Sequence, residues 1–369
     1  MILLLHNRYR ITGGEERAVA DLRWLISEHL GEETEVLERD SATLGPLAAA
    51  GALLRGGLAP EDVGAAVRRT GARVLHAHNL HPAFGARALE AARAAGARVV
   101  VHLHNYRLVC AVGTCFTQGA DCTRCHGRNT LPGIRHNCRG SRAEAVAYAA
   151  GLARQQHRIA AATDAWVVPS PFALGRLEAL GAPLGGRARA VASVQRDIAG
   201  HSEAAGGRYA LVAARLAPEK GVDVAIDACR EAGVPLVVCG EGPAEPGLRA
   251  RAAGADVRFE GRVAQARLAE LRRGAALALV PSRYAEILPL AAAEAMAAGL
   301  PTLASDAGGL ADLVPAPERV KPGDPHALAE RIRARFGDAE AGERALCAVR
   351  ERCAPAVVAA ALREVYAGA

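Results

Sequence analysis

Lysine is almost absent from this chain of 369 residues: only Lys220 and Lys321 occur, and nearly all of the positive charge is carried by arginine. Aromatic residues make up 4% of the sequence, too few to suggest the stacking platforms that bind single-stranded nucleic acids. The arginines are scattered, so the net charge of +6 does not form the clustered basic patch typical of nucleic-acid binding. A dispersed positive charge is compatible with anionic substrates or an anionic membrane surface.

Long apolar runs are also missing. No stretch of about 18 apolar residues occurs, so the sequence predicts no transmembrane helix. The start, Met-Ile-Leu-Leu-Leu-His, lacks a basic leader and resembles a first strand more than a signal peptide. We therefore expect a cytoplasmic protein, with peripheral contact at the inner face of the cell membrane left open. Hydrophobic residues at 51% argue against disorder.

Short apolar runs alternate with alanine-rich helical stretches along the chain. The runs lack strict alternation, as expected for strands buried on both faces of a parallel sheet. Helical segments between them predict α/β units of the doubly wound kind. The expected strands are 2–5, 74–76, 99–103, 165–168, 210–213, 236–239, 257–259, 277–280 and 302–304.

A break in this rhythm near residues 190–207 predicts a domain boundary. We expect an N-terminal Rossmann-like domain over residues 1–192 and a second Rossmann-like domain over residues 193–350. A C-terminal helix within 351–369 is expected to pack back on the first domain. Two doubly wound domains facing a cleft would bind ligands at the carboxyl ends of their strands.

The segment 286–309 holds two glutamates, Glu286 and Glu294, on either side of Pro289. Proline is favoured at the first position of a helix, which places Glu286 in the loop before a helix and Glu294 in its second turn. The free amides and the positive end of the helix dipole make an anion site there. The pattern suggests a nucleotide-sugar site, although the bare spacing also fits an amphipathic helix with two solvated glutamates.

A second motif, in residues 211–221, supplies cations. Arg215 and Lys220 follow an expected strand and precede a helix that begins near Gly221. Two cations beside a helix start can neutralise a diphosphate, and arginine can do so through two parallel hydrogen bonds. The alternative is a solvated charged turn.

Together these motifs resemble the retaining glycosyltransferases of family 4. Glu286 and Glu294 match the E-x7-E signature, and Arg215 with Lys220 is similar to the family's pyrophosphate-binding pair. The turn 239–243 resembles a Gly-x-Gly-Pro turn, and residues 13–16 resemble a Gly-Gly-x-Glu loop. The resemblance covers most of residues 208–335 and implies the GT-B architecture of two Rossmann-like domains.

The resemblance implies sugar transfer from a nucleoside diphosphate sugar of the UDP or GDP type to an acceptor hydroxyl. Retention of the anomeric configuration, a glycan or lipid-linked acceptor, a role in exopolysaccharide or cell-envelope glycan synthesis and no catalytic divalent metal are implied as well. Arg215 and Lys220 would stabilise the departing diphosphate, Glu286 the sugar, Glu294 the ribose, and His104 the sugar subsite. Further donor-site residues implied are Gly13, Gly14, Gly240, Gly242, Ile287, Leu288 and Leu290.

Some positions depart from the family pattern. Ile287 stands where glycine or asparagine is common, and Asp312 stands where glutamate is usual. The segment 192–197 lacks the usual Pro-Asn between the domains. None of these departures removes Arg215, Lys220 or the two glutamates.

Five cysteines cluster between residues 110 and 138. Cys122 and Cys125 have the C-x2-C spacing of metal ligands, with Cys110 upstream and Cys138 downstream. Four thiolates arranged in this way suit a closed structural zinc site. The stretch also resembles an insertion, 110–140, of a family 4 subgroup in which these four cysteines recur and Cys115 is extra. Free thiols and disulfides stay open as alternatives.

Two histidine pairs, His76 with His78 and His102 with His104, lie near expected strand ends. Residues two apart in a strand share a face, so either pair is compatible with metal binding. Packed or surface histidines are the simpler interpretation.

Two other classes of function remain as rivals. An epimerase or phosphorylase with the same fold would act on sugar nucleotides or phosphorylated glycans. A non-enzymatic, zinc-containing nucleic-acid binder would need clustered basic residues and salt-sensitive binding.

Overall fold

The computed structural model describes residues 1–9, 14–287 and 289–368. Its chain divides into two units. Unit 1 contains Met1–Cys115, Cys122–Val194 and Pro355–Ala369, and unit 2 contains Phe116–Asp121 and Gln195–Ala354. Each unit is built on one six-stranded sheet in which all neighbouring strands are parallel. The predicted doubly wound α/β class is therefore confirmed.

The sheet of unit 1 has the strand order β2-β1-β3-β4-β7-β8. Its inner strands are buried on both faces, which explains their nearly continuous apolar sequence. The strands are β1 (Ile2–Arg8), β2 (Thr34–Asp40), β3 (Val74–His78), β4 (Arg98–His102), β7 (Ala165–Val168) and β8 (Ala188–Ala190).

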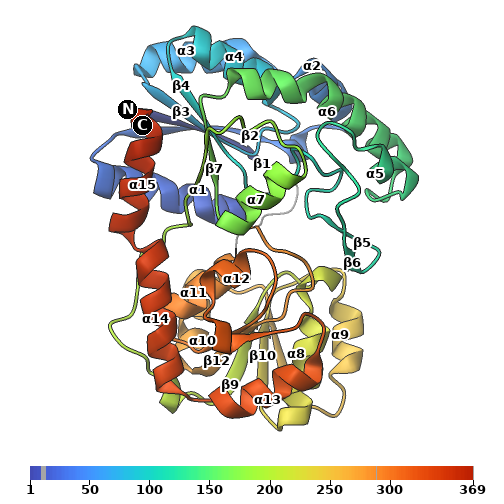
Figure 1. The fold of residues 1–369 in the computed structure, drawn as a ribbon, viewed down its shortest axis with the longest axis vertical. Helices are drawn as coiled ribbons and strands as arrows, with labels where there is room; N and C mark the ends of the chain where they lie inside the picture. Colours follow the sequence, from blue (N-terminus) through green and yellow to red (C-terminus); the bar gives the residue numbers. More distant parts are fainter. Residues whose placement is uncertain (10–13, 288, 369) are drawn as a thin grey trace. The chain divides into compact units, whose positions relative to one another are not determined.

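Helices cover both faces of this sheet, as Figure 1 shows. On one face, α1 (Gly14–Leu25) and α15 (Pro355–Ala367) pack Leu22, Val358 and Leu362 against β1, β3 and β4. On the other lie α3 (Pro60–Thr70), α4 (Gly85–Ala94) and α6 (Arg142–Ala162), the last capped by the Ser141 side chain. The remaining helical segments are η1 (Ile26–Leu30), η2 (Ser41–Thr43), α2 (Pro46–Arg55), α5 (Leu131–Arg135) and α7 (Pro171–Ala179).

The sheet of unit 2 has the order β11-β10-β9-β12-β13-β14, so that its direction of growth reverses between β9 and β12. Successive side chains of β9 point to opposite faces of the sheet. Ala210 and Val212 belong to the hydrophobic cluster on one face, and Leu211 belongs to the cluster on the other. The strands are β9 (Tyr209–Ala213), β10 (Leu236–Cys239), β11 (Val257–Gly261), β12 (Ala275–Val280), β13 (Thr302–Ser305) and β14 (Arg319–Val320). The short hairpin of β5 (Phe116–Thr117) and β6 (Ala120–Asp121) is antiparallel.

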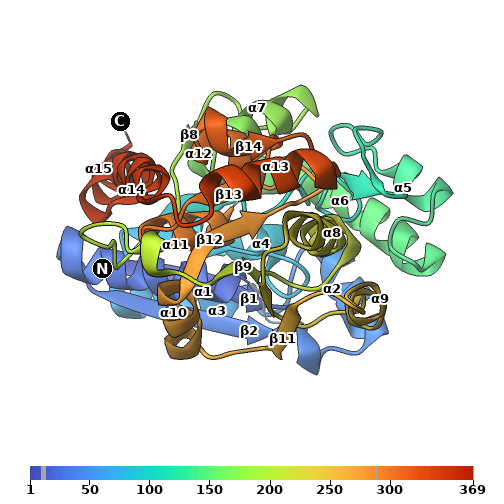
Figure 2. The same cartoon turned by 90° about the horizontal axis from the view of Figure 1, so that it is seen from below.

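Two groups of helices enclose the sheet of unit 2. The cluster on one face includes α8 (Val222–Ala232), α9 (Glu245–Arg251) and α13 (Pro325–Arg335), and Figure 2 shows α8 and α13 side by side. The cluster on the other face includes α10 (Gln265–Arg273) and α11 (Leu290–Ala297), and α14 (Ala339–Cys353) packs on α11. The shorter segments are η3 (Ala204–Gly206), η4 (Pro218–Lys220), α12 (Gly309–Leu313) and η5 (Ala316–Glu318).

Every strand expected from the sequence is present, with ends that shift by a few residues. Five strands were not expected: β2, β8 and β14 lie at sheet edges, and β5 and β6 form the separate hairpin. β2 is only half-buried and mixes polar with apolar residues, which conceals it in the sequence. The helix start at Pro289 was predicted one residue too early: α11 begins at Leu290, because the Pro289 backbone has a non-helical ψ of 59°.

Across the part of the chain that the structure describes, no helix combines the length and the apolar character needed to span a membrane.

Candidate functional site

The carboxyl edge of the unit 2 sheet gathers the residues that the sequence singled out. The loop after β9 carries Arg215 and Lys220, and the loop after β12 carries Glu286. The strand order reverses between β9 and β12, and ligands of open α/β sheets bind at such switch points. The predicted cations and one predicted carboxylate are therefore brought to the usual binding position of this kind of sheet.

Lys220 and Glu286 form an ion pair at the centre of this edge. The Lys220 Nζ lies 2.9 Å from Glu286 Oε1, and the two side chains are 19% and 4% exposed. The hydroxyl of Ser282 donates a hydrogen bond to the same oxygen, and Lys220 also donates to the Tyr284 hydroxyl at 3.2 Å. Among the described contacts none engages the second carboxylate oxygen, Oε2, so it is available to a ligand hydroxyl.

The charge on Lys220 is strongly maintained. Burial opposes that charge, yet the neighbouring Glu286 carboxylate and Tyr284 raise the pKa of Lys220 above its ordinary value. Burial also raises the pKa of Tyr284, with a further contribution from Glu286. The site therefore holds a permanent cation, a neutral phenol and a carboxylate in contact.

Arg215 lies at the exposed side of the same loop. Its guanidinium pairs with Glu219, four residues along, and its side chain is 46% exposed. Exposed ion pairs of this kind contribute little to stability. Arg215 is therefore able to exchange Glu219 for an anionic ligand at small cost.

Gly240 and Gly242 support this loop. Gly240 has a φ of +134°, and a Cβ atom there would lie 1.9 Å from the Ala214 carbonyl oxygen. A Cβ atom on Gly242 would lie 2.3 Å from the Leu216 carbonyl oxygen. These glycines let the turn after β10 pack directly on the backbone around Arg215.

The loop before α11 is anchored from both sides. Ile287 is buried, Leu290 opens α11, and Leu288 lies outside the described residues. The Gly309 amide donates a hydrogen bond of 2.7 Å to the Glu286 carbonyl oxygen. Glu294 lies in the second turn of α11, as predicted, and forms an ion pair with Arg272 of α10.

The carboxyl edge of the unit 1 sheet holds a second polar group. Gly13 lies outside the described residues, whereas Gly14 opens α1 and is exposed. The Asn105 side-chain amide donates to Glu15 Oε1 at 3.1 Å and to the Tyr9 hydroxyl at 3.2 Å. Burial raises the pKa of Glu15 to about 7. The Arg107 guanidinium stacks on the Tyr9 ring, 4.3 Å from its centroid.

His104 belongs to a histidine cluster in which His6, His76, His78 and His104 are buried and His102 is half-buried. Its Nε2 lies 2.7 Å from the Nδ1 of His78, and its ring stacks on His102 at 4.2 Å between centroids. The cluster forms because the strand register places His6, His78 and His102 side by side across β1, β3 and β4. The structure therefore places His104 against other histidines of unit 1.

The histidine rings do not have the arrangement of a metal site. One ligand nitrogen from each of His76, His78 and His102 lies within 4.8 Å of the others. Tetrahedral zinc with bonds of 2.0–2.1 Å requires nitrogens about 3.3 Å apart, with every ring plane pointing at the metal. The His76 and His78 rings are stacked with only 15° between their planes, so their in-plane lone pairs lie in separate, nearly parallel planes and do not converge on one metal position. Ring packing explains the cluster better.

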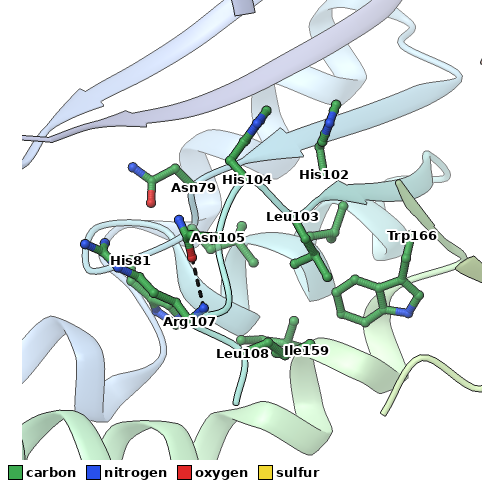
Figure 3. Close-up of a pocket in the computed structure, with 12 residues that line it drawn as sticks. Asn79, His81, His102, Leu103, His104, Asn105, Arg107, Leu108, Ile159 and Trp166 are labelled. Atoms are coloured by element: carbon green, nitrogen blue, oxygen red, sulfur yellow. Dashed lines mark hydrogen bonds between the residues drawn. The ribbon is translucent and has the colours of Figure 1, made fainter. Parts of the chain in front are cut away.

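A small pocket borders the histidine cluster within unit 1. Its polar lining includes Asn79, His81, Asn105 and Arg107, and Trp166 closes one side. In Figure 3, His102 and His104 project to one side of their chain segment, whereas Asn105 and Arg107 project to the other. The Asn105 side-chain oxygen accepts from the Arg107 amide at 3.0 Å, which fixes the direction of its donor group.

The cysteine cluster is not assembled around a metal-sized centre. Cys110 is buried, Cys122, Cys125 and Cys138 are half-buried, and all are free thiols. Within the described chain, no three of their sulfurs lie within 4.8 Å of one another. A hydrogen bond from Cys115 lowers the pKa of Cys110 to about 6, against the effect of burial. The structure thus pairs Cys110 with Cys115, which the sequence had set aside.

Sequence reasoning missed several polar residues of these sites. Ser282 and Tyr284 lie in the loop between β12 and Glu286. Ser282 contacts Glu286 and Tyr284 contacts Lys220, which spacing alone did not indicate. Arg272 is one of many arginines, and no local pattern marks it as the partner of Glu294. In unit 1, the sequence signal that could have pointed to Asn105 was its position directly after His104.

The two parallel sheets, each with helices on both faces, define the GT-B class of glycosyltransferase fold. Residues 194–346 match the family model described as glycosyl transferases group 1. That stretch contains Arg215, Lys220, Glu286 and Glu294.

Solved structures of similar fold cover almost the whole chain. Alr3699/HepE from Anabaena, solved with UDP and glucose, is 18% identical, with a TM-score of 0.65 over 100% of this chain and 99% of that one. Sucrose-phosphate synthase from Thermosynechococcus elongatus is 19% identical, with a TM-score of 0.67 over 99% and 98%. A glycosyltransferase from Rickettsia africae is 12% identical, with a TM-score of 0.66 over 99% and 97%. The comparison with curated proteins finds no match.

Proposed function

We propose that this protein transfers a sugar from a nucleoside diphosphate sugar to an acceptor hydroxyl with retention of the anomeric configuration. The observation that carries the proposal is the ion pair between the half-buried Lys220 and the buried Glu286 at the switch point of the unit 2 sheet. It lies inside the stretch that matches the glycosyltransferase family model. A permanently charged lysine beside a carboxylate with one available oxygen suits a ligand that carries both phosphate and sugar hydroxyls.

The demanding step is departure of the diphosphate from the anomeric carbon. The acceptor oxygen forms the new bond as the bond to the phosphate oxygen breaks, and the acceptor proton passes to the leaving diphosphate. Lys220 and Arg215 stabilise the negative charge that develops on the phosphate oxygens. Lys220 is already oriented by Glu286 and Tyr284, so little reorganisation is needed when the donor binds.

The carboxylates hold the two ends of the donor. Glu286 accepts hydrogen bonds from the sugar hydroxyls through Oε2, and Glu294 accepts them from the ribose. We assign His104 to the sugar subsite, and Gly13 and Gly14 to the phosphates. A UDP-type donor is supported by the Anabaena protein, which was solved with UDP-glucose. We further propose a glycan or lipid-linked acceptor in cell-envelope glycan synthesis, and contact with the inner membrane face.

Thermal shift measurements with UDP-, GDP- and ADP-sugars test the donor site. We expect one nucleotide class to raise the melting temperature, because a ligand at 100 times its dissociation constant adds about 2.7 kcal/mol of stability. The matching free sugar and inorganic sulfate serve as controls and should have little effect. The absence of a shift with every nucleotide would rule out the transferase proposal.

We also propose that Cys110, Cys122, Cys125 and Cys138 bind a structural zinc ion. Zn–S bonds of about 2.3 Å require sulfurs about 3.8 Å apart, so this loop must contract around the metal. We expect about one zinc per purified chain by elemental analysis, and loss of the metal from a Cys122→Ser, Cys125→Ser variant. Replacing the exposed Cys347 with serine is the matched control. Less than about half a zinc per wild-type chain would argue against the site.

A further inference from the structure

Glu294 is not a solvated residue on the surface of α11. It forms an ion pair with Arg272, and the two side chains are only 15% and 11% exposed. The Arg272 Nη2 group donates to Oε2 of the carboxylate. Among the described residues, no contact engages the other oxygen, Oε1. Because each carboxylate oxygen accepts hydrogen bonds through two lone pairs, Glu294 retains capacity for a ligand.

The helix that carries Arg272 is packed into a hydrophobic core. Arg272 lies in the last turn of α10, directly after the buried Leu271, and Leu271 shares a hydrophobic cluster with Ala295 of α11. The pair therefore joins two helices that pack on the same face of the unit 2 sheet. The relative position of Arg272 and Glu294 therefore depends on how α10 and α11 pack, as well as on the two side-chain conformations.

We propose that Arg272 is a positioning residue that holds the Glu294 carboxylate in place for the ribose hydroxyls of the donor nucleotide. The inference rests on the proposed function, in which Glu294 binds ribose. Arg272 occupies one carboxylate oxygen, restrains the Glu294 side chain and leaves the other oxygen to accept hydrogen bonds from the ribose. A preorganised carboxylate binds a diol more tightly than a mobile one, because less side-chain freedom is lost on binding.

The test compares UDP with 2′,3′-dideoxyuridine diphosphate, which lacks both ribose hydroxyls, by isothermal titration calorimetry. The wild-type protein should prefer UDP by about tenfold or more, the range expected for hydrogen bonds to a charged group. Arg272→Gln should weaken UDP by about tenfold while changing the dideoxy nucleotide by less than about threefold. Arg273→Gln, at the adjacent exposed position, is the matched control and should retain the wild-type preference.

A second set of variants separates positioning from general support of the fold. In a Glu294→Gln background the Arg272→Gln change should add little, since its partner is already altered. Arg272→Lys should restore part of the preference and provides the same comparison if Arg272→Gln does not fold. The inference is overturned if Arg272→Gln retains the preference, or if both nucleotides weaken equally. If wild-type protein binds neither UDP, GDP nor ADP, the proposed function fails, and this inference fails with it.

Discussion

Unfolding of the protein is expected to become much easier as the pH falls from 7 to 5. The cause is a group of buried imidazoles in unit 1 that are neutral in the folded protein. Burial lowers the pKa of His81 to about 4 and that of His102 to about 3. Burial also lowers the pKa values of the remaining members of the histidine cluster, which are His6, His76, His78 and His104.

The sign follows from proton binding. A histidine whose folded pKa lies below its unfolded value of 6.5 binds protons preferentially in the unfolded chain, so stability is lost as the pH falls below about 6.5. Each such residue contributes about 1.4 kcal/mol per pH unit, so His81 and His102 alone remove roughly 4 kcal/mol by pH 5. Glu15, with its pKa raised to about 7, acts in the opposite direction. Because Glu15 is a single group and several histidines act against it, the net result is still a loss of stability as the pH falls.

Urea titrations followed by circular dichroism at fixed pH values measure the effect. His102→Phe should reduce the loss of stability per pH unit by about 1.4 kcal/mol, because one titrating group is removed. His326→Asn, at a site 73% exposed, is the control and should leave the slope unchanged. A free energy of unfolding that stays within about 1 kcal/mol from pH 7 to pH 5 would show that these histidines are not buried as described.

Replacing Lys220 with methionine is expected to destabilise the protein by about 3 kcal/mol or more, and to abolish donor binding. The stability effect arises because Glu286, only 4% exposed, would remain buried without its counter-ion. Donor binding fails for a different reason, the loss of the cation that faces the diphosphate. Thermal unfolding with and without the donor selected by the shift assay measures both effects.

The double variant Lys220→Met, Glu286→Gln separates these two effects. Removing the unpaired carboxylate should restore most of the lost stability without restoring the donor-induced shift. Lys321→Met, which replaces the other lysine at an exposed position, is the control and should behave as wild type. A Lys220→Met variant that binds the donor normally would contradict the assigned role of Lys220.

The strands inside each sheet could be predicted because burial on both faces leaves a nearly continuous apolar run. The edge strand β2 could not, since it pairs with a neighbour on one side only, its residues are mostly half-buried and its sequence is mixed. The helix ends were close to their predicted positions where proline or glycine marked them. Pro289 showed the limit of that rule by preceding the first helical residue.

The sequence predicted which residues of the candidate site lie on loops, but it did not predict which of them contact each other. Lys220 and Glu286 are 66 positions apart in the chain, and Arg272 and Glu294 are 22 apart. Each pair meets only because of the strand order or helix packing, which spacing along the chain does not encode. The histidines illustrate the same point: the sequence shows two i, i+2 pairs, whereas the cluster requires β1, β3 and β4 to be neighbours.

The return of α15 to unit 1 has a consequence for how the protein is made. On the ribosome, residues 195–354 of unit 2 emerge before the last segment of unit 1, Pro355–Ala369. Until that segment emerges, one face of the first sheet lacks Val358, Leu362 and Tyr366, and His76 lacks the hydroxyl of Tyr366 that lies 2.7 Å from its Nδ1. Unit 1, which is begun first, is therefore completed only after residues 195–354 of unit 2 have been synthesised, and a nascent chain must protect that apolar face until α15 has emerged.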